Sequence, residues 1–203
     1  MKTYSILILL VTGVIFSASG QDDLQRVAQQ AVEDLRQLVA NEEFRGKNLP
    51  SPEALSNARI GQAVAHHVIE LEALRGYSPQ TDPNRIIKEI DRVTVPVASG
   101  SNSRVIATIE LDRNDQKWQI GELGNQQYMQ MYEELRQHLD LRPEDARLVR
   151  VPAFNLYFLA TGERMALLSD KAFGDIPPRE LQPAREVLRT LVPVAQSYNG
   201  LPW

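Results

Sequence analysis

The spacing between apolar residues changes part-way along this chain, and the change limits the folds that it can adopt. Up to residue 76, apolar side chains recur every three or four positions, which is typical of amphipathic helices. Between residues 93 and 120 they alternate with polar side chains, which is typical of strands with one buried face. Helices that precede a run of strands joined by short turns favour an α+β architecture over an all-helical or an all-β one.

Two helices are expected before the change of spacing. The first begins near Asp22 and ends before Pro50. Its apolar face is formed by Leu24, Val27, Ala28, Ala31, Leu35, Leu38 and Val39. The second helix is expected to open at Ser51, a residue suited to capping, and to end at Gly76. Its apolar face would be formed by Ile60, Val64, His67, Val68, Leu71 and Leu74.

A polar, proline-containing connector at residues 78–84 precedes the first group of expected strands. These strands cover residues 93–97, residues 105–111 and a segment that begins at Trp118, and the short turns between them predict an antiparallel meander. Pro96 has no N–H to donate to a neighbouring strand, so the first of these strands is expected at an edge of the sheet. Its apolar side chains are those of Val93, Val95 and Val97.

A helix is expected after each of two groups of strands. The first of these helices opens at Asn125, and the second runs from Leu181 to Val192, where Pro193 kinks or ends it. Three further strands are expected between them, at residues 148–151, 154–160 and 165–168. The predicted order is therefore helix, helix, three strands, helix, three strands, helix.

In its helix-then-meander units the chain resembles cystatin-like and PepSY-type secreted domains. The resemblance is one of pattern only, because the chain carries no diagnostic motif of either family. It implies an α+β fold in which N-terminal helices are followed by antiparallel β meanders that alternate with helices. It assigns no activity and no site residue, since one fold can serve many functions.

The first twenty residues have the composition of a secretory signal peptide. Lys2 supplies a positive charge, an apolar run follows from Ile6 to Phe16, and small residues lead up to Gly20. We expect cleavage after Gly20, so that the mature chain begins at Gln21. The alternative, a retained membrane anchor, needs about 18–20 apolar residues, more than this run provides. The rest of the sequence has no long apolar stretch, so no membrane span is expected after cleavage.

We expect residues 21–77 to form a helical region and residues 78–203 an α+β region, packed together as one compact domain. A chain of this length can bury an adequate core without disulfides, and this one has no cysteine. The absence of cysteine excludes thiolate nucleophiles, cysteine-ligated metals and lipid-bearing cysteines. The formal net charge of -4 argues against a nucleic-acid partner, which normally meets a basic surface. The glycines are scattered rather than gathered in a phosphate-binding loop, so no cofactor is predicted.

His66, His67 and Glu70 form the densest cluster of side chains that could carry chemistry. On the expected helix, His66 and Glu70 lie four residues apart and share a face, and imidazole and carboxylate groups are zinc ligands. The two histidines are adjacent, however, whereas the helix of a zinc protease spaces them four apart. The alternative interpretation makes His67 a core residue and His66 part of a surface ion pair. No catalytic residue and no metal site are therefore predicted, and these three residues are the candidates for metal binding.

The sequence favours a non-catalytic binding or interaction module, secreted or periplasmic, whose ligand is a peptide, a protein partner or a small apolar molecule. The edge expected at Val93, Val95 and Val97 would accept an added strand, and Trp203 is a second candidate for contact with a partner. One alternative is a hydrolase or metal-dependent enzyme that uses His66 or His67 with nearby carboxylates. Another is a structural component of a cell-envelope assembly. The sequence leaves the oligomeric state open.

Overall fold

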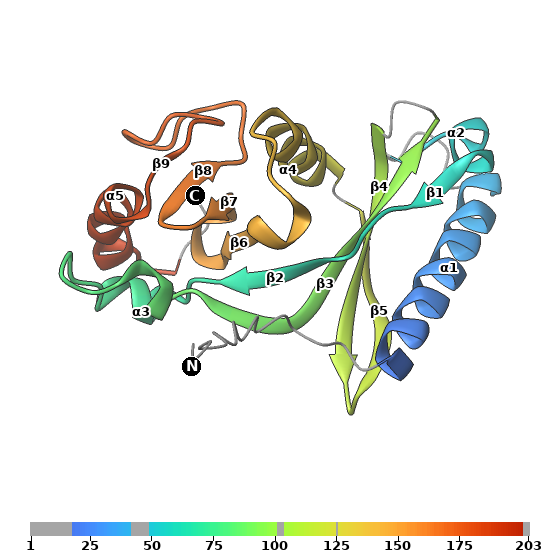
Figure 1. The fold of residues 1–203 in the computed structure, drawn as a ribbon, viewed down its shortest axis with the longest axis horizontal. Coiled ribbons are helices and arrows are strands. Elements are labelled where there is room, and N and C mark those ends of the chain that lie inside the picture. The colour runs from blue at the N-terminus through green and yellow to red at the C-terminus, as the bar shows by residue number, and fades with distance from the viewer. Residues whose placement is uncertain (1–17, 42–48, 101–103, 125, 201–203) are drawn as a thin grey trace, which may run out of the picture.

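The computed structural model describes residues 18–41, 49–100, 104–124 and 126–200, and the fold of these residues is α+β (Figure 1). Its α-helices are α1 (Ala18–Ala40), α2 (Pro52–Ser56), α3 (Leu71–Arg75), α4 (Gln126–His138) and α5 (Ala184–Ser197). Its strands are β1 (Ala58–Ile60), β2 (Val64–Val68), β3 (Lys88–Ser99), β4 (Arg104–Asn114), β5 (Lys117–Gly124), β6 (Arg147–Val151), β7 (Leu156–Thr161), β8 (Arg164–Leu167) and β9 (Gln182–Pro183). Short 3-10 turns cover Pro83–Arg85, Pro143–Asp145 and Pro152–Phe154.

All of the described strands belong to one sheet. Their order is β5-β4-β3-β2-β6-β7-β8-β9, and β1 pairs with β3 beside β2. Neighbouring strands run antiparallel except β2 and β6, which run parallel. The two meanders expected from the sequence, β3–β5 and β6–β8, are therefore confirmed, and β2 joins them into a single sheet.

Alternate residues along the strands show how the helices are layered on this sheet. Val95 packs beneath α1, whereas its neighbour Thr94 faces Tyr128 of α4. In the second meander Phe158 packs beneath α5, whereas its neighbour Leu159 packs beneath α4. Helices α1 and α5 therefore cover the two ends of one face, and α4 covers the middle of the other (Figure 1).

The second expected helix is wrong beyond its first turn. Helix α2 opens at Ser51, whose hydroxyl accepts from the N–H of Ala54 as predicted, but it ends at Ser56. Residues 58–68 then form β1 and β2, and only α3 remains of the helix expected up to Gly76. Valine, isoleucine, histidine and glycine are weak helix formers, and pairing of this segment with β3 and β6 decides the outcome.

The strand expected at a sheet edge is also placed wrongly, because β3 is central. It pairs with β4 on one side and with β1 and β2 on the other. The carbonyl of Pro96 accepts the N–H of Gly61 at 2.8 Å. Since the N and the C=O of a strand residue point to the same side, the nitrogen of Pro96 faces the point where the chain passes from β1 to β2. At this crossing no neighbouring strand needs a backbone hydrogen bond from the nitrogen of Pro96.

The remaining elements agree with the sequence with small shifts of boundary. Strand β7 begins at Leu156 rather than Phe154, because Asn155 takes the left-handed conformation with φ 51°. Helix α5 continues through Pro193 to Ser197. The apolar run of the expected signal peptide lies outside the described residues, and α1 begins at Ala18. Among the helices of the described ranges, none combines the length and the apolar character needed to cross a bilayer.

Candidate functional site

Strand β1 has an outer edge that no other described strand covers. Its inner edge pairs with β3, in a register that runs from Ala58↔Ser99 to Ile60↔Val97. Strand β2 pairs with the same side of β3, but it is also paired on its far side with β6. The place beside β1 that a longer β6 would fill is therefore open.

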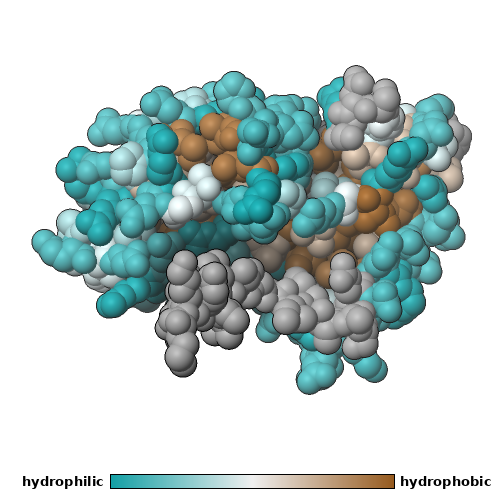
Figure 2. Space-filling view, in the orientation of Figure 1, coloured by the Kyte–Doolittle hydropathy of each residue, from teal (hydrophilic) through white to brown (hydrophobic). Residues whose placement is uncertain are grey.

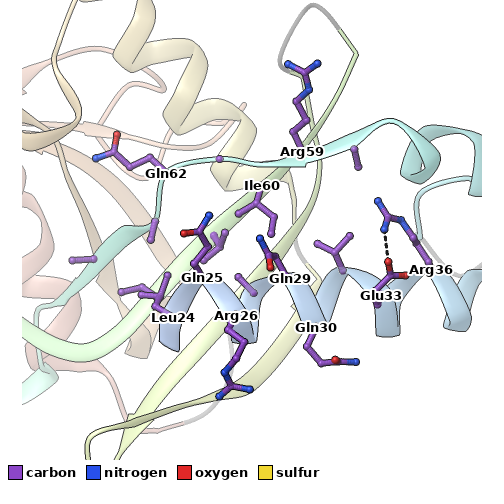
Figure 3. Close-up of a pocket in the computed structure, with 18 residues that line it drawn as sticks. Leu24, Gln25, Arg26, Gln29, Gln30, Glu33, Arg36, Arg59, Ile60 and Gln62 are labelled. Carbon is purple, nitrogen blue, oxygen red and sulfur yellow. Dashed lines mark hydrogen bonds and ion pairs between the residues drawn. The ribbon is translucent and has the colours of Figure 1, made fainter. Parts of the chain in front are cut away.

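A hollow of about 1010 Å³, which we call the α1 hollow, lies between β1 and helix α1 (Figure 3). Figure 3 shows Ile60 pointing from β1 toward α1, while Gln25 and Gln29 point from α1 toward the strand. The apolar part of its lining comes from Leu24, Ala28, Val32, Ala58, Ile60, Ala63, Ala65, Val93 and Val95. Figure 2 shows this apolar surface between the strands and α1, bordered by hydrophilic side chains of the helix.

A second hollow, of about 840 Å³, lies on the other side of β1 and is called the α4 hollow. Arg59 points to this side, away from α1 (Figure 3). Its walls carry charges of both signs: Glu133 and Arg136 of α4 form an ion pair at 2.7 Å, and Glu144 and Arg147 stand at the start of β6. The free edge of β1 thus lies between an apolar hollow and a charged one.

The backbone of β1 alternates in the direction of its hydrogen-bonding groups. The N–H of Gly61 points toward β3, because it donates to Pro96. Because these directions alternate along a strand, the backbone N–H and C=O of Arg59 also point to β3. The N–H and C=O groups of Ala58 and Ile60 therefore point outward. The edge therefore presents two N–H groups and two carbonyls to an incoming strand.

The two strands that end the sheet are less suited to accept another strand. In β5 the N–H of Trp118 already donates to the carboxylate of Asp23 at 3.3 Å, and exposed Lys117 and Glu122 add charge along the strand. Charged side chains on an edge discourage further pairing. Strand β9 has two residues, one of them Pro183, which has no N–H.

The structure separates the three residues that the sequence offered as candidates for metal binding. They come from β2 and from the residue before α3, not from one helix face. His66 is buried, His67 is partly buried on the other face of the strand, and exposed Glu70 pairs with Lys88 at 2.9 Å. The expectation that His67 is the core histidine and His66 the surface one is therefore reversed. Within the described ranges, no three His, Asp or Glu side chains converge in a way that could hold a metal ion.

His66 begins a chain of buried polar contacts on the α4 side of the sheet. Its Nε2 lies 2.5 Å from the hydroxyl of Thr94, which in turn lies 3.3 Å from the hydroxyl of Tyr128. Tyr128 donates to Glu110 at 2.8 Å. Arg92 donates to Glu110 at 3.3 Å and binds Asp112 through two contacts of 2.6 and 3.0 Å. We call these six residues the polar chain.

Burial shifts the pKa of two members of the polar chain, His66 and Tyr128. It lowers the pKa of His66 to about 4, and the nearby positive charges of Arg92 and Arg150 act in the same direction. His66 is therefore neutral at pH 7. Burial, and after it the negative charge of Glu110, raises the pKa of Tyr128, which stays protonated and able to donate. The polar chain is thus a satisfied structural network rather than a set of groups poised to exchange protons.

The three valines proposed from the sequence as a free strand edge do not form a surface. Val93, Val95 and Val97 are each 4% exposed or less and are paired on both sides of their strand, so they cannot take an added strand. Val93 and Val95 reach the α1 hollow as part of its floor. Trp203 lies outside the described residues.

Comparisons with family models, curated proteins and solved structures find no match to this chain. The sequence did contain one signal for the candidate site: Gly61 interrupts the helix expected between Ser51 and Gly76. A Cβ atom at this position would lie 2.8 Å from Cγ of Pro96, so only glycine lets β1 and β3 approach this closely.

Proposed function

We propose that this protein is a non-catalytic binding module that adds an extended peptide, or an exposed strand of a protein partner, to the outer edge of β1. The observation that carries this proposal is the free edge of β1 between two hollows on opposite faces of the sheet. Recognition by strand addition takes its affinity from main-chain hydrogen bonds and its specificity from pockets for alternate side chains.

The two hollows suggest the composition of the ligand. Successive residues of an added strand point to opposite faces, so odd positions would enter one hollow and even positions the other. The apolar floor of the α1 hollow suits apolar side chains, while the amides of Gln25 and Gln29 supply donors at its rim. The charged walls of the α4 hollow suit polar or charged side chains. The preferred ligand therefore alternates apolar and polar residues.

A small apolar molecule in the α1 hollow is the second candidate. The same apolar lining supports it, and the volume is at the upper end of typical small-ligand pockets, which is about 1000 Å³. Such a ligand would make no use of the outward N–H groups of Ala58 and Ile60. This difference allows an experiment to separate the two.

The histidines give no support to the alternative of a hydrolase. His66 is 1% exposed and is held by Thr94, and Glu70 is engaged with Lys88. We also propose that the protein acts outside the cytoplasm, as a secreted or periplasmic protein. That proposal rests on the pattern of residues 1–20 alone.

Selection of peptides from a random library against the full chain tests the proposed function. We expect enrichment of peptides with alternating apolar and polar residues. Hydrogen exchange should then show protection of the amides of Ala58 and Ile60 on binding. N-methylation of the bound peptide should abolish binding at every second residue and be tolerated between, since only alternate amides of an added strand face β1.

A pair of variants on α1 completes this test. Gln29→Trp places a large ring in the α1 hollow from an exposed position and should weaken binding about tenfold or more, since it fills space the ligand needs. Gln37→Trp is the matched control, on an exposed position of the same helix that does not line the hollow. If no peptide is selected, or if selected peptides protect β5 and ignore Gln29→Trp, strand addition at β1 is refuted.

A further inference from the structure

Strand β1 carries one charged side chain, that of Arg59, between Ala58 and Ile60. Arg59 is exposed, and among the residues that the structure describes it makes no hydrogen bond or ion pair. A charged side chain on a strand edge discourages pairing with a further strand. The outer edge of β1 is therefore open in its backbone but carries a positive charge that has no partner.

Two carboxylates in the walls of the α4 hollow are already bound to arginines. Glu133 pairs with Arg136 at 2.7 Å. Glu144 pairs with Arg142 at 3.3 Å. Neither glutamate is paired with Arg59, so the charge of this residue is not neutralised from the opposite wall of the hollow.

The remaining charged groups of the α4 hollow stand near the junction of β2 and β6. Arg147, the first residue of β6, donates to the side-chain oxygen of Asn84 at 2.8 Å. Exposed Glu89 lies opposite His67 in the register of β3 with β2, eight residues along the chain from Arg59. Of all these charged groups only Arg59 belongs to β1, so it is the one that an added strand would lie directly beside.

The backbone of β1 fixes how a ligand residue would meet Arg59. Its N–H and C=O point to β3, so it presents a non-hydrogen-bonded position to an antiparallel ligand. Opposite residues are closest at such positions, with Cα atoms about 4.5 Å apart, and they share a face of the sheet. The ligand residue opposite Arg59 would therefore point into the α4 hollow, and its two neighbours would point into the α1 hollow.

We propose that the strand bound at β1 carries an acidic residue between two apolar ones, and that this acidic side chain pairs with Arg59. The inference rests on the proposed function and adds to it the identity of the central ligand residue. Opposite charges that face each other across two strands stabilise the pairing, so an aspartate or glutamate turns the charge on this edge into a favourable contact. The apolar neighbours would lie beside Ile60 in the α1 hollow (Figure 3).

The same charge disfavours a second copy of this chain as the ligand. Two β1 strands that pair antiparallel about their centres would place Arg59 opposite its own counterpart. Like charges directly opposite one another destabilise a pair of strands. The proposed partner is therefore a different chain, one that offers an acidic residue on an extended segment.

Peptide selection against two forms of the full-length chain tests this proposal. Peptides selected by the native chain, and shown by hydrogen exchange to protect the amides of Ala58 and Ile60, should carry aspartate or glutamate between two apolar residues. The charge-reversed variant Arg59→Glu should select lysine or arginine at the same position. Arg185→Glu is the matched control, because Arg185 is exposed on α5 and lines neither hollow, and it should select the same peptides as the native chain.

Titrations with the tightest acidic peptide measure the size of the effect. Replacement of its acidic residue by the corresponding amide should weaken binding to the native chain about two- to fivefold, as loss of a cross-strand ion pair does. The Arg59→Glu variant should bind the acidic peptide about tenfold more weakly than the native chain, because attraction is replaced by repulsion. Arg59→Gln should bind the acidic peptide and its amide form equally, and it carries the test if Arg59→Glu does not fold.

The possible failures of the two proposals are distinct. Peptides that protect β1 without an acidic preference, or that Arg59→Glu selects equally well, would overturn the pairing with Arg59 and leave strand addition standing. If Arg185→Glu changed the preference as strongly as Arg59→Glu, the effect would belong to net charge and the pairing would again be overturned. If no selected peptide protects β1, both proposals are wrong.

Discussion

The two ends of the sheet are covered by helices in different ways. At one end β6–β9 lie beneath α5, and α3 packs against that helix from the side (Figure 1). Arg75 of α3 donates to the carbonyls of Ala195 and Tyr198 at 2.9 and 2.6 Å, which fastens the end of α5. At this end, which we call the closed end, α5 covers the strands and α3 holds the end of α5 in place.

At the other end α1 packs against β4 and β5 and leaves the flank toward β1 uncovered. Its contact face includes Ala28 and Ala31, whose small side chains let the helix lie close to the sheet. In the part of the chain that the structure describes, α2 packs against the end of α1, where Arg36 donates to the carbonyl of Leu55 at 3.2 Å, and the space beside the first turns of α1 stays open. The comparison teaches that a binding surface can arise where one sheet is long enough for two helices and only one end receives a full covering.

The largest effect that we predict concerns His66, which lies where the two ends meet. Its pKa falls from an ordinary value of 6.5 to about 4 in the folded protein, so the unfolded chain takes up a proton first as the pH decreases. The free energy of unfolding should therefore drop by about 3 kcal/mol between pH 6.5 and pH 4 because of this residue alone.

Urea unfolding at a series of pH values, for the native chain and for His66→Gln, isolates this contribution. The difference in unfolding free energy between the two proteins should change by that amount across the interval. A constant difference would mean that His66 takes up its proton at the same pH in the folded and the unfolded chain, and would contradict its burial as a neutral residue.

A matched pair of truncations compares the packing of the two ends. Val187 of α5 is 0% exposed within the closed core, whereas Val32 of α1 is 5% exposed and lines the α1 hollow. Val187→Ala should cost about 2–3 kcal/mol, since it removes two buried carbons and leaves a cavity. Val32→Ala should cost about 1 kcal/mol, because its loss enlarges a space that is already open. Equal costs in chemical denaturation would show that the two ends are packed alike.

A smaller effect than that of Val187→Ala is predicted at the crossing between β1 and β2. Gly61→Ala would bring Cβ within 2.8 Å of Pro96, so strand β1 must shift, at a cost of about 1–2 kcal/mol. Gly124→Ala at the end of β5 is the control, since its nearest neighbour is a glutamate oxygen at 3.7 Å. Thermal unfolding of both variants measures the difference, and an unaffected Gly61→Ala would show that the approach of β1 to β3 is not close.

The helices and meanders that were predicted correctly are those with one clear period. The apolar face of α1 repeats every three or four residues from Leu24 to Val39, about four turns, and β4 alternates from Val105 to Leu111, so each pattern fits only one structure. The pattern of residues 60–71 fits both a helix and a strand. Ile60, Val64, Val68 and Leu71 suit a helix, while Val64, His66 and Val68 suit a strand once a histidine is allowed inside. Pairing with distant strands, not local preference, made the choice.

The candidate site was hidden by the same ambiguity. Pro96 was interpreted as marking an edge, although the edge belongs to β1, the strand beside it. Whether a strand lies at an edge depends on which other strands pair with it. The strands that pair with β1 and β2 are β3 and β6, which lie far from them in the sequence.

The parallel pairing of β2 with β6 leaves one edge of β2 unpaired, and open to aggregation, until β6 has been synthesised. It matches His66 with Leu148, so one side of β2 is completed by chain that is made about 80 residues later. At a synthesis rate of about 5–20 residues per second, β2 waits about 4–16 seconds for its partner. During this interval the unpaired backbone runs from β1 through β2 as one edge. A growing chain therefore exposes a longer unpaired strand edge than the finished protein does. Once β6 has paired with β2, only the β1 part of that edge remains unpaired.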